Sequence, residues 1–463
     1  MKTAPVQSMQ PLRIVAGLAM AATVPFLFTA CGTSAGLKSA QAQYRAGNVK
    51  GALSTIRSTA AKQREDGKDA PVIRLEHASI ALTAGEMKEA ADAFRLADQA
   101  IEYRDQKPVV QLGREASAML TNLNAMPYNT SPAERVMGAS LMAVSFAANG
   151  ELDKARSAIK LAKNRQKDNF EKFATQIDRE RNSMKQALEA DPRLRIDLRP
   201  QKVDDTVRQL NDAASQFQPY ANFTVPYAEL LAGIVLGAGA NPETVRSRES
   251  FSNAIAANPS NSQLRKAAGG AVSGVTHVII EEGAAPSLGA FRVDLPLFIN
   301  GNIVMFSAAL PKLQPTAPER FQASLRAGGQ NIEAEPVCNF DRIVAAEYKR
   351  KMPATVARTV AASALKSVIS YVGQQALKKN GKDDGMAGLF AIASGIYNVA
   401  SAQADERIWA TLPKTVRYAV IPTPSSGEVE VNGQKVKLAK DGSTKLVIAR
   451  CVNGSVNAQS IGL

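Results

Sequence analysis

The chain has 463 residues, of which 45% are hydrophobic, so it is long and apolar enough for two or three domains with their own cores. Lysine and arginine outnumber aspartate and glutamate by 56 to 42, which gives a formal net charge of +14. The basic residues are spread along the chain, which favours a solvated surface over one dedicated anion site.

The first 30 residues have the pattern of an export signal. Lys2 and Arg13 precede an almost wholly apolar run from Ile14 to Ala30, and no acidic residue accompanies them. The run is short for a helix that spans a bilayer, and Pro25 interrupts it. We therefore expect residues 1–30 to form a signal peptide.

A cysteine follows the apolar run directly. The stretch Leu27-Phe28-Thr29-Ala30-Cys31 resembles a bacterial lipobox, although Phe28 stands where that pattern prefers Leu, Val or Ala. The resemblance implies lipidation of Cys31 (palmitate and related acyl chains), a short lipidated linker at 31–36, and, because Gly32 rather than Asp follows, an outer-membrane location facing the periplasm. A plain secretory signal with an incidental cysteine is the alternative.

An exported chain meets a particular set of anions. Without Lys2 and Arg13 the mature protein keeps a net charge of +12. Its expected anionic neighbours are lipid head groups, lipopolysaccharide, peptidoglycan carboxylates or acidic protein faces, and not nucleic acid.

The front half contains a repeated motif. Glycine, an acid, an apolar residue and, after two more positions, alanine occur at 85–90 and 150–155, with a weaker copy at 47–52. Glycine suits the turn that ends one helix, and small residues let two helices pack closely. The expected packing residues are Gly85, Ala90, Phe94, Ala97, Gly150, Ala155, Ile159 and Ala162. A fourth unit is predicted at 227–259.

These units resemble the tetratricopeptide helix-turn-helix repeat, which implies an α-solenoid over 37–268. Their spacing is uneven, so the array is degenerate. The stretch 160–191 mixes both charges and predicts a long exposed helix. Solenoids of this kind usually hold a peptide or a partner protein on a concave face.

From Gly274 the periodicity of apolar residues changes towards two, which predicts a small antiparallel β domain over 274–463. An apolar helical pair within 341–402 interrupts it. Its first helix is expected at 341–379 with a break at Pro353, and its second at 385–402. The second helix is expected to be a buried hairpin partner, with membrane insertion as the alternative. Asn432-Gly433 predicts a hairpin turn.

Cys338 and Cys451 are the only other cysteines. In an oxidising compartment such a pair is a disulfide candidate. The bridge would close a loop of more than a hundred residues, for which the ideal stabilisation is about 4–5 kcal/mol. Two buried thiols are the alternative.

The sequence predicts no enzyme, no metal site and no cofactor. His77 and His277 have no second ligand at metal-binding spacing. The one Gly-x-Ser-x-Gly match, Gly32 to Gly36, directly follows the lipobox cysteine and no predicted strand precedes it, so it does not form a nucleophile elbow, and the sequence contains no phosphate loop. The carboxylate pair Asp204-Asp205 is expected in a solvated turn.

The order of lipobox, helical repeats and interrupted β unit resembles a family of uncharacterised bacterial lipoproteins with a tetratricopeptide-like front half. The stretch 395–424 carries the resemblance through Asp405-Glu406-Arg407-Ile408-Trp409-Ala410-Thr411-Leu412-Pro413. The family implies an envelope lipoprotein without an established activity, associated with cell-wall synthesis. Physically, we expect Trp409 to anchor a helix-to-strand corner, with Asp405 and Arg407 pairing or capping around it. A recognition patch is the alternative.

These features together predict an outer-membrane-anchored lipoprotein that acts as a non-enzymatic protein-binding scaffold of the cell envelope. Its expected partners are the membrane, through Cys31, and an envelope protein, through the helical repeats. The alternatives are a protein that binds peptidoglycan or another anionic glycan, and an accessory factor of cell-wall synthesis or outer-membrane assembly.

Overall fold

The structure, a computed structural model, describes the residues listed at the end of this sentence: 32–106, 127–168, 175, 178, 200–220, 223–270, 274–299, 302–317, 323–379, 404–440, 442 and 444–463. The signal peptide at 1–30, Cys31 and the apolar helix at 385–402 lie outside them. So does the predicted charged helix beyond residue 168, apart from residues 175 and 178. The described residues combine helices with sheets, which confirms the α+β class.

The helices of the front half follow one another in pairs. They are α1 (Gly32–Arg45), α2 (Val49–Ala61), α3 (Ala70–Ala84), α4 (Met87–Gln106), α6 (Pro132–Ala148), α8 (Pro200–Ser215), α9 (Pro226–Gly237), α10 (Thr244–Ala257) and α11 (Ser262–Gly269), and residues 152–168 are also helical. The linker expected at 31–36 is therefore wrong from Gly32 onward, because α1 begins there. A proline lies in the first turn of α3, α6 and α9, where its missing N–H costs no helical hydrogen bond.

The repeat motif marks the turns between paired helices. Gly85 ends α3 with a φ of 88°, and Gly150 has a φ of 76°, so both adopt the left-handed conformation that glycine tolerates best. The remaining predicted packing residues, Ala90, Phe94, Ala97, Ala155, Ile159 and Ala162, are all buried. In the fourth unit, a Cβ on Gly233 of α9 would lie 2.9 Å from the ring of Phe251, so glycine is what lets α10 approach.

Within the described residues, the strands of the back half form three sheets. The strands are β1 (Val275–Glu282), β2 (Ser287–Ile299), β3 (Asn302–Gln314), β4 (Leu325–Ala327), β5 (Gln330–Ile332), β6 (Glu335–Asn339), β7 (Thr415–Pro422), β8 (Glu428–Val431), β9 (Gln434–Lys437), β10 (Lys445–Val452) and β11 (Ser455–Gly462). The main sheet has the order β11-β10-β1-β7-β6, and a smaller one has the order β5-β4-β8-β9. β1 and β10 pair in parallel, so the antiparallel expectation is wrong for the centre of the main sheet. Asn432 and Gly433 form the predicted turn between β8 and β9, with φ values of 48° and 82°.

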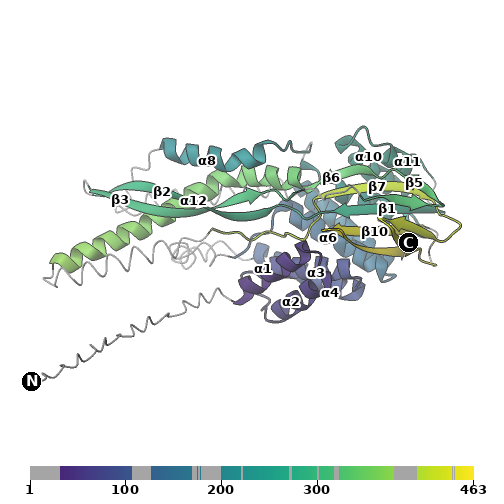
Figure 1. Cartoon of the computed structure of the whole chain (residues 1–463), viewed down its shortest axis with the longest axis horizontal. Helices are drawn as coiled ribbons and strands as arrows, with labels where there is room; N and C mark the ends of the chain where they lie inside the picture. Colours follow the sequence, from purple (N-terminus) through teal and green to yellow (C-terminus); the bar gives the residue numbers. More distant parts are fainter. Residues whose placement is uncertain are drawn as a thin grey trace, which may run out of the picture.

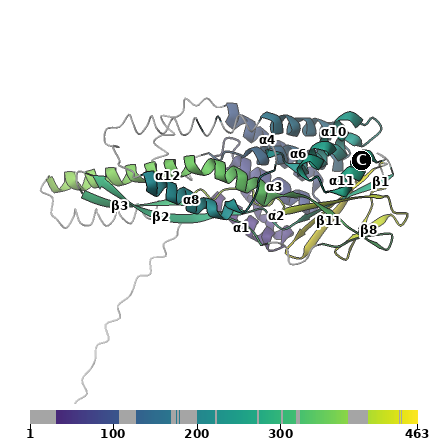
Figure 2. The same cartoon turned by 90° about the horizontal axis from the view of Figure 1, so that it is seen from above.

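The main sheet lies between two layers (Figures 1 and 2). Val278 and Ile280 of β1 pack towards the small sheet, in a cluster that includes residues of β4, β8 and β9. Ile279 belongs to the cluster that contains α3, α4, α6, α9 and α10. Adjacent residues of a strand face opposite sides, so β1 is covered on both faces. The helical half and the β half thus share one core.

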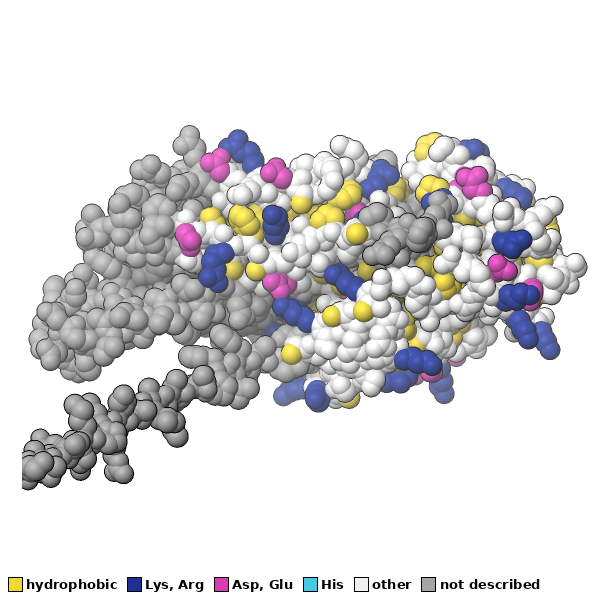
Figure 3. All heavy atoms as spheres, viewed as in Figure 1, with side chains coloured by type: hydrophobic (Ala, Val, Ile, Leu, Met, Phe, Trp, Pro, Cys, Tyr) yellow, Lys and Arg dark blue, Asp and Glu magenta, His cyan; other side chains and the backbone are white. Residues whose placement is uncertain are grey.

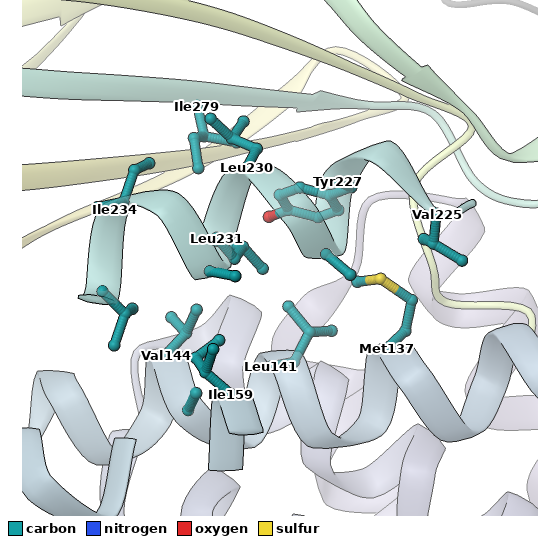
Figure 4. Packing of buried hydrophobic residues seen from close by; sticks show 14 of the residues in the cluster. Met137, Leu141, Val144, Ile159, Val225, Tyr227, Leu230, Leu231, Ile234 and Ile279 are labelled. Carbon is teal, nitrogen blue, oxygen red and sulfur yellow. The ribbon is translucent and has the colours of Figure 1, made fainter. Parts of the chain in front are cut away.

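Figure 4 shows this shared core at α9. Leu230, Leu231 and Ile234 of α9 lie between Leu141 on α6 and Ile279 on β1. All twelve residues of α9, from Pro226 to Gly237, are buried. A helix buried all round is hydrophobic all round, which is why its sequence contains no amphipathic stripe.

A projection extends from the body (Figures 1 and 2). It consists of the β2–β3 hairpin, α8, and α12 (Phe340–Lys379). The break expected at Pro353 is wrong, because α12 continues through it as one 40-residue helix. Met352 and Val356, on either side of the proline, are buried against Leu310 and other residues of β3, and this packing outweighs the hydrogen bond that proline removes.

The predicted disulfide between Cys338 and Cys451 is wrong. Cys338 lies on β6 and Cys451 on β10, and strands β7 and β1 separate them in the sheet. Three strand spacings amount to about 14 Å, whereas the Cα atoms of a disulfide lie within about 7 Å. The two thiols also belong to clusters on opposite faces of the sheet.

Candidate functional site

The helices of the front half bury one face against other parts of the same chain. The first helices of three pairs, α3, α6 and α9, are buried along most of their length. They face the main sheet and an irregular segment over residues 404–414, which we call the inner segment. The inner segment leads directly into β7, so it connects the helices that it contacts to the main sheet.

Two glutamates on the first helices bind the main chain of the inner segment. The Glu76 carboxylate of α3 accepts a hydrogen bond from the Ala410 N–H at 2.7 Å, and from the Thr411 hydroxyl. The Glu134 carboxylate of α6 accepts one from the Trp409 N–H at 2.9 Å. Backbone N–H groups need a hydrogen-bond partner when they are buried. Here the two carboxylates accept the hydrogen bonds that the carbonyl groups of a neighbouring strand would otherwise accept.

Burial affects the ionisation of these acids. Glu76 is fully buried, and burial raises the pKa of its carboxyl above the ordinary value, against the opposing effect of its hydrogen bonds with Thr411 and Gln41. Glu229 occupies a similar place on α9, where its carboxylate accepts hydrogen bonds from Gln166 and Asn253. Burial likewise raises the pKa of Glu229. A buried acid on each first helix is a feature that sequence reasoning missed, although a single acid inside an apolar helix was a visible signal.

Trp409 anchors the inner segment. Its side chain is 1% exposed, and its ring packs edge-on against Phe94 with centroids 6.2 Å apart. The indole N–H lies 3.0 Å from the Ser79 hydroxyl and 3.1 Å from that of Thr411. The structure therefore places Trp409 in the core, where its apolar body and its polar N–H both have partners.

Arg407 joins the inner segment to α3 by ion pairs. Its guanidinium lies 2.6 Å from the Asp69 carboxylate and 2.7 Å from that of Asp405. Burial alone would lower the pKa of Arg407, but the hydrogen bonds and charges of the two aspartates raise it. Burial by itself would raise the pKa of Asp405, but the hydrogen bond and charge of Arg407 hold this pKa below its ordinary value. The structure thus brings Asp405, Arg407 and Trp409 together as a corner around the end of α3.

A second polar cluster joins β10 to the helices. The Arg450 Nε atom donates to the Tyr44 hydroxyl at 2.8 Å, and Nη2 donates to the Thr411 carbonyl at 3.1 Å. Nearby, the Tyr227 hydroxyl donates to Glu281 of β1 at 2.6 Å. Sequence reasoning did not single out these residues, because β10 and β1 differ little from other apolar strands in local pattern.

An open recess borders the inner segment beside α12. It has a volume of about 100 Å³, with Phe340, Val344 and Trp409 among its apolar lining and Glu347 and Lys351 among its polar lining. Glu347 accepts a hydrogen bond from the Ala133 N–H at 2.8 Å, at the first turn of α6. Burial raises the pKa of Glu347 to about 7.

A smaller recess lies on the other side of Glu347. Its lining includes Tyr220, Phe223, Arg342 and Arg350. The Arg342 guanidinium lies 3.8 Å from the centre of the Tyr220 ring, and that of Arg350 lies 5.4 Å from the Phe223 ring. Phe223 is 42% exposed and has a φ of 52°, a strained conformation for a bulky residue.

The histidines lie apart from these recesses. His77 contacts Glu89 at 2.6 Å, and His277 contacts the Tyr418 hydroxyl at 2.6 Å. Burial lowers the pKa of His277 to about 4, so this ring is neutral near pH 7. Within the described residues, no group of three or more His, Cys, Asp or Glu side chains could hold a metal ion.

Comparison with known proteins adds no family to these observations. No family model, no curated protein and no solved structure matches the chain. The function is therefore argued from the residues and their geometry.

Proposed function

We propose that this protein is a non-enzymatic scaffold of the bacterial envelope, anchored to the outer membrane by acyl chains on Cys31. In this proposal the front half is a degenerate tetratricopeptide-like solenoid. The observation that carries it is the filled groove: Glu76 and Glu134 hold the chain's own inner segment where such a solenoid would hold a peptide. Because the two halves share one hydrophobic cluster, we expect a partner to bind the outer surfaces of the molecule.

The filled groove changes where a protein partner is expected to bind. Ion pairs link the outer helices to one another. Arg57 of α2 pairs with Glu89 of α4, and Arg165 pairs with Asp98 of α4. Basic side chains are scattered over the face in Figure 3. Val245 on α10 is 82% exposed, which is unusual for an apolar side chain on this body. We therefore expect contact with a protein partner on the outer helices, around α4 and α10.

The anchoring part of the proposal can be tested by fractionation of cells. Cys31→Ser removes the sulfur that would carry the acyl chain, so we expect the variant to leave the membrane fraction at high salt. Cys338→Ala is the matched control, because this cysteine lies in the core and we expect the variant to stay with the membrane. Retention of Cys31→Ser in the membrane fraction would contradict lipid anchoring.

The partner-binding part needs a separate measurement. A photo-crosslinking amino acid at position 245 should capture one dominant envelope protein in living cells. The same group at Thr316, near the root of the β2–β3 hairpin, serves as a positional control. Equal capture from both positions, or capture from neither, would argue against a binding surface on the outer helices.

One observation favours a second candidate, the binding of peptidoglycan or another anionic glycan. The smaller recess combines aromatic rings with two guanidinium groups, and sugars stack on the former while carboxylates pair with the latter. If this candidate is correct, sedimentation with purified cell-wall sacculi should weaken steeply with salt and with Phe223→Ala. Salt-independent sedimentation, or none, would remove it.

A further inference from the structure

Three neighbouring strands of the main sheet place polar side chains in one row. The register sets Glu281 of β1 beside Arg450 of β10, and Arg450 opposite Asn457 of β11. Side chains that lie opposite each other on an antiparallel pair share a face, and their Cβ atoms are about 4.5–5.5 Å apart. Ile279 and Leu446, at even spacings along β1 and β10, belong to the cluster shared with the helices. The row therefore faces the helical half.

The guanidinium of Arg450 uses only part of its donor capacity on the protein. Its Nε donates to the Tyr44 hydroxyl of α1, and its Nη2 donates to the Thr411 carbonyl of the inner segment. The third nitrogen, Nη1, is buried and has no hydrogen-bond partner among the described residues. The side chain as a whole is 2% exposed. A buried charged donor without an acceptor is costly, so Nη1 needs a ligand that accepts a hydrogen bond.

Asn457 presents a second donor of this kind. Its Nδ2 is buried and likewise has no partner in the described part of the chain. Arg450 and Asn457 both line a recess with a volume of about 30 Å³. One water molecule needs about 10–15 Å³ of such space, so the recess admits a monatomic ion or two waters and no large molecule. Among its described lining side chains, only these two nitrogens are buried without a partner.

The charges around the recess favour an anion on the β11 side of Arg450. Glu281 is the one acid among the lining residues, and it lies on β1, beyond Arg450 as seen from Asn457. Two strand spacings, or about 10 Å, separate β1 from β11. Glu281 accepts a hydrogen bond from the Tyr227 hydroxyl of α9 at 2.6 Å. The side of the guanidinium that faces Asn457 therefore has no acid among the described lining residues.

We propose that Arg450 Nη1 and Asn457 Nδ2 bind a small monovalent anion, of the size of chloride, between β10 and β11. A guanidinium and an amide both donate to such an ion, and hydrogen bonds with charged groups are the stronger ones. Arg450 also holds α1 and the inner segment, so the anion would strengthen the junction of the helical half with the main sheet. This site depends neither on lipidation of Cys31 nor on a protein partner.

The first test measures stability against chloride at constant ionic strength, with gluconate as the replacing anion because it is too large for the recess. An anion that binds only the folded state raises the folding equilibrium constant, by up to about tenfold for each tenfold rise in concentration above its dissociation constant. We expect nearly this response from urea unfolding in the millimolar range. Asn457→Leu removes one donor and should reduce the response to less than twofold. Asn331→Leu, the same change at an exposed position of β5, is the matched control and should keep the full response.

The second test needs no variant. Bromide can replace chloride and scatters X-rays anomalously, so crystals of the unmodified protein soaked in bromide should show an anomalous peak within hydrogen-bond distance of Arg450 Nη1 and Asn457 Nδ2. A water at this place, or a direct hydrogen bond from Arg450 to the Asn457 amide oxygen, would overturn the inference. An equal chloride response in Asn457→Leu and the unmodified protein would also overturn it, because a bromide peak would then be an adventitious ion only. These outcomes are independent of the fractionation of Cys31→Ser.

Discussion

Replacement of Trp409 by alanine tests whether this residue is a core anchor or a recognition patch. The side chain is 1% exposed and packs against Phe94, so its removal leaves a cavity between the inner segment and the helices. Substitutions of this size in a core cost about 3–5 kcal/mol. Trp409→Phe keeps most of the ring and loses the indole N–H. Because the Ser79 and Thr411 hydroxyls also bond to each other, we expect this variant to cost only about 1–2 kcal/mol.

The measurement is the free energy of unfolding from a urea titration followed by far-ultraviolet circular dichroism, which does not depend on tryptophan fluorescence. A double-mutant cycle with Phe94→Ala should give a coupling of about 0.5–1.5 kcal/mol, as for other edge-on aromatic pairs. Tyr103→Ala is the control, since this ring is 40% exposed and its loss should change stability by less than about 0.5 kcal/mol. A cost below about 1 kcal/mol for Trp409→Ala, with no coupling to Phe94, would refute the core role.

Three further predictions follow from the same geometry. Arg407→Ala should cost about 1.5–3 kcal/mol of unfolding free energy, because it removes the charged hydrogen bonds to Asp69 and Asp405 while Lys68 remains as a partner of Asp69; a cost below about 0.5 kcal/mol would mean that the ion pairs of Arg407 are solvated. Since the native state holds His277 neutral with a pKa of about 4 and the unfolded chain takes up a proton near pH 6.5, stability should be complete above that pH and fall by up to about 3 kcal/mol towards pH 4. His277→Gln should flatten this dependence in unfolding titrations, and an unchanged slope would exclude His277 as its source. Reductant should leave the melting temperature unchanged, and mass spectrometry should find free thiols at both Cys338 and Cys451, with native Cys338 alkylated slowly because burial raises its pKa to about 12; a mass two units lower would instead show a bond between these two residues.

The sequence by itself determined the local structure of the repeats. A glycine at the end of a helix indicates a left-handed turn, and the alanines after it indicate close packing of two helices. Gly85 and Ala90 could therefore be interpreted without knowledge of the fold. The strands of the small sheet and the Asn432-Gly433 turn were visible for the same reason. β11 was missed, because its sequence SVNAQSIG lacks apolar alternation and its pairing partner β10 defines it.

The pairing of distant segments was decided only by the tertiary structure. Sequence spacing placed Cys338 and Cys451 in the same domain, but strand order puts two strands between them. Pro353 predicted a break, yet packing of α12 on β3 keeps the helix continuous. The use of Glu76 and Glu134 as acceptors for the inner segment joins residues more than 270 positions apart. Local sequence specifies conformation through φ, ψ and side-chain volume, whereas the occupant of a groove depends on which distant segment reaches it, and that is a property of the whole chain.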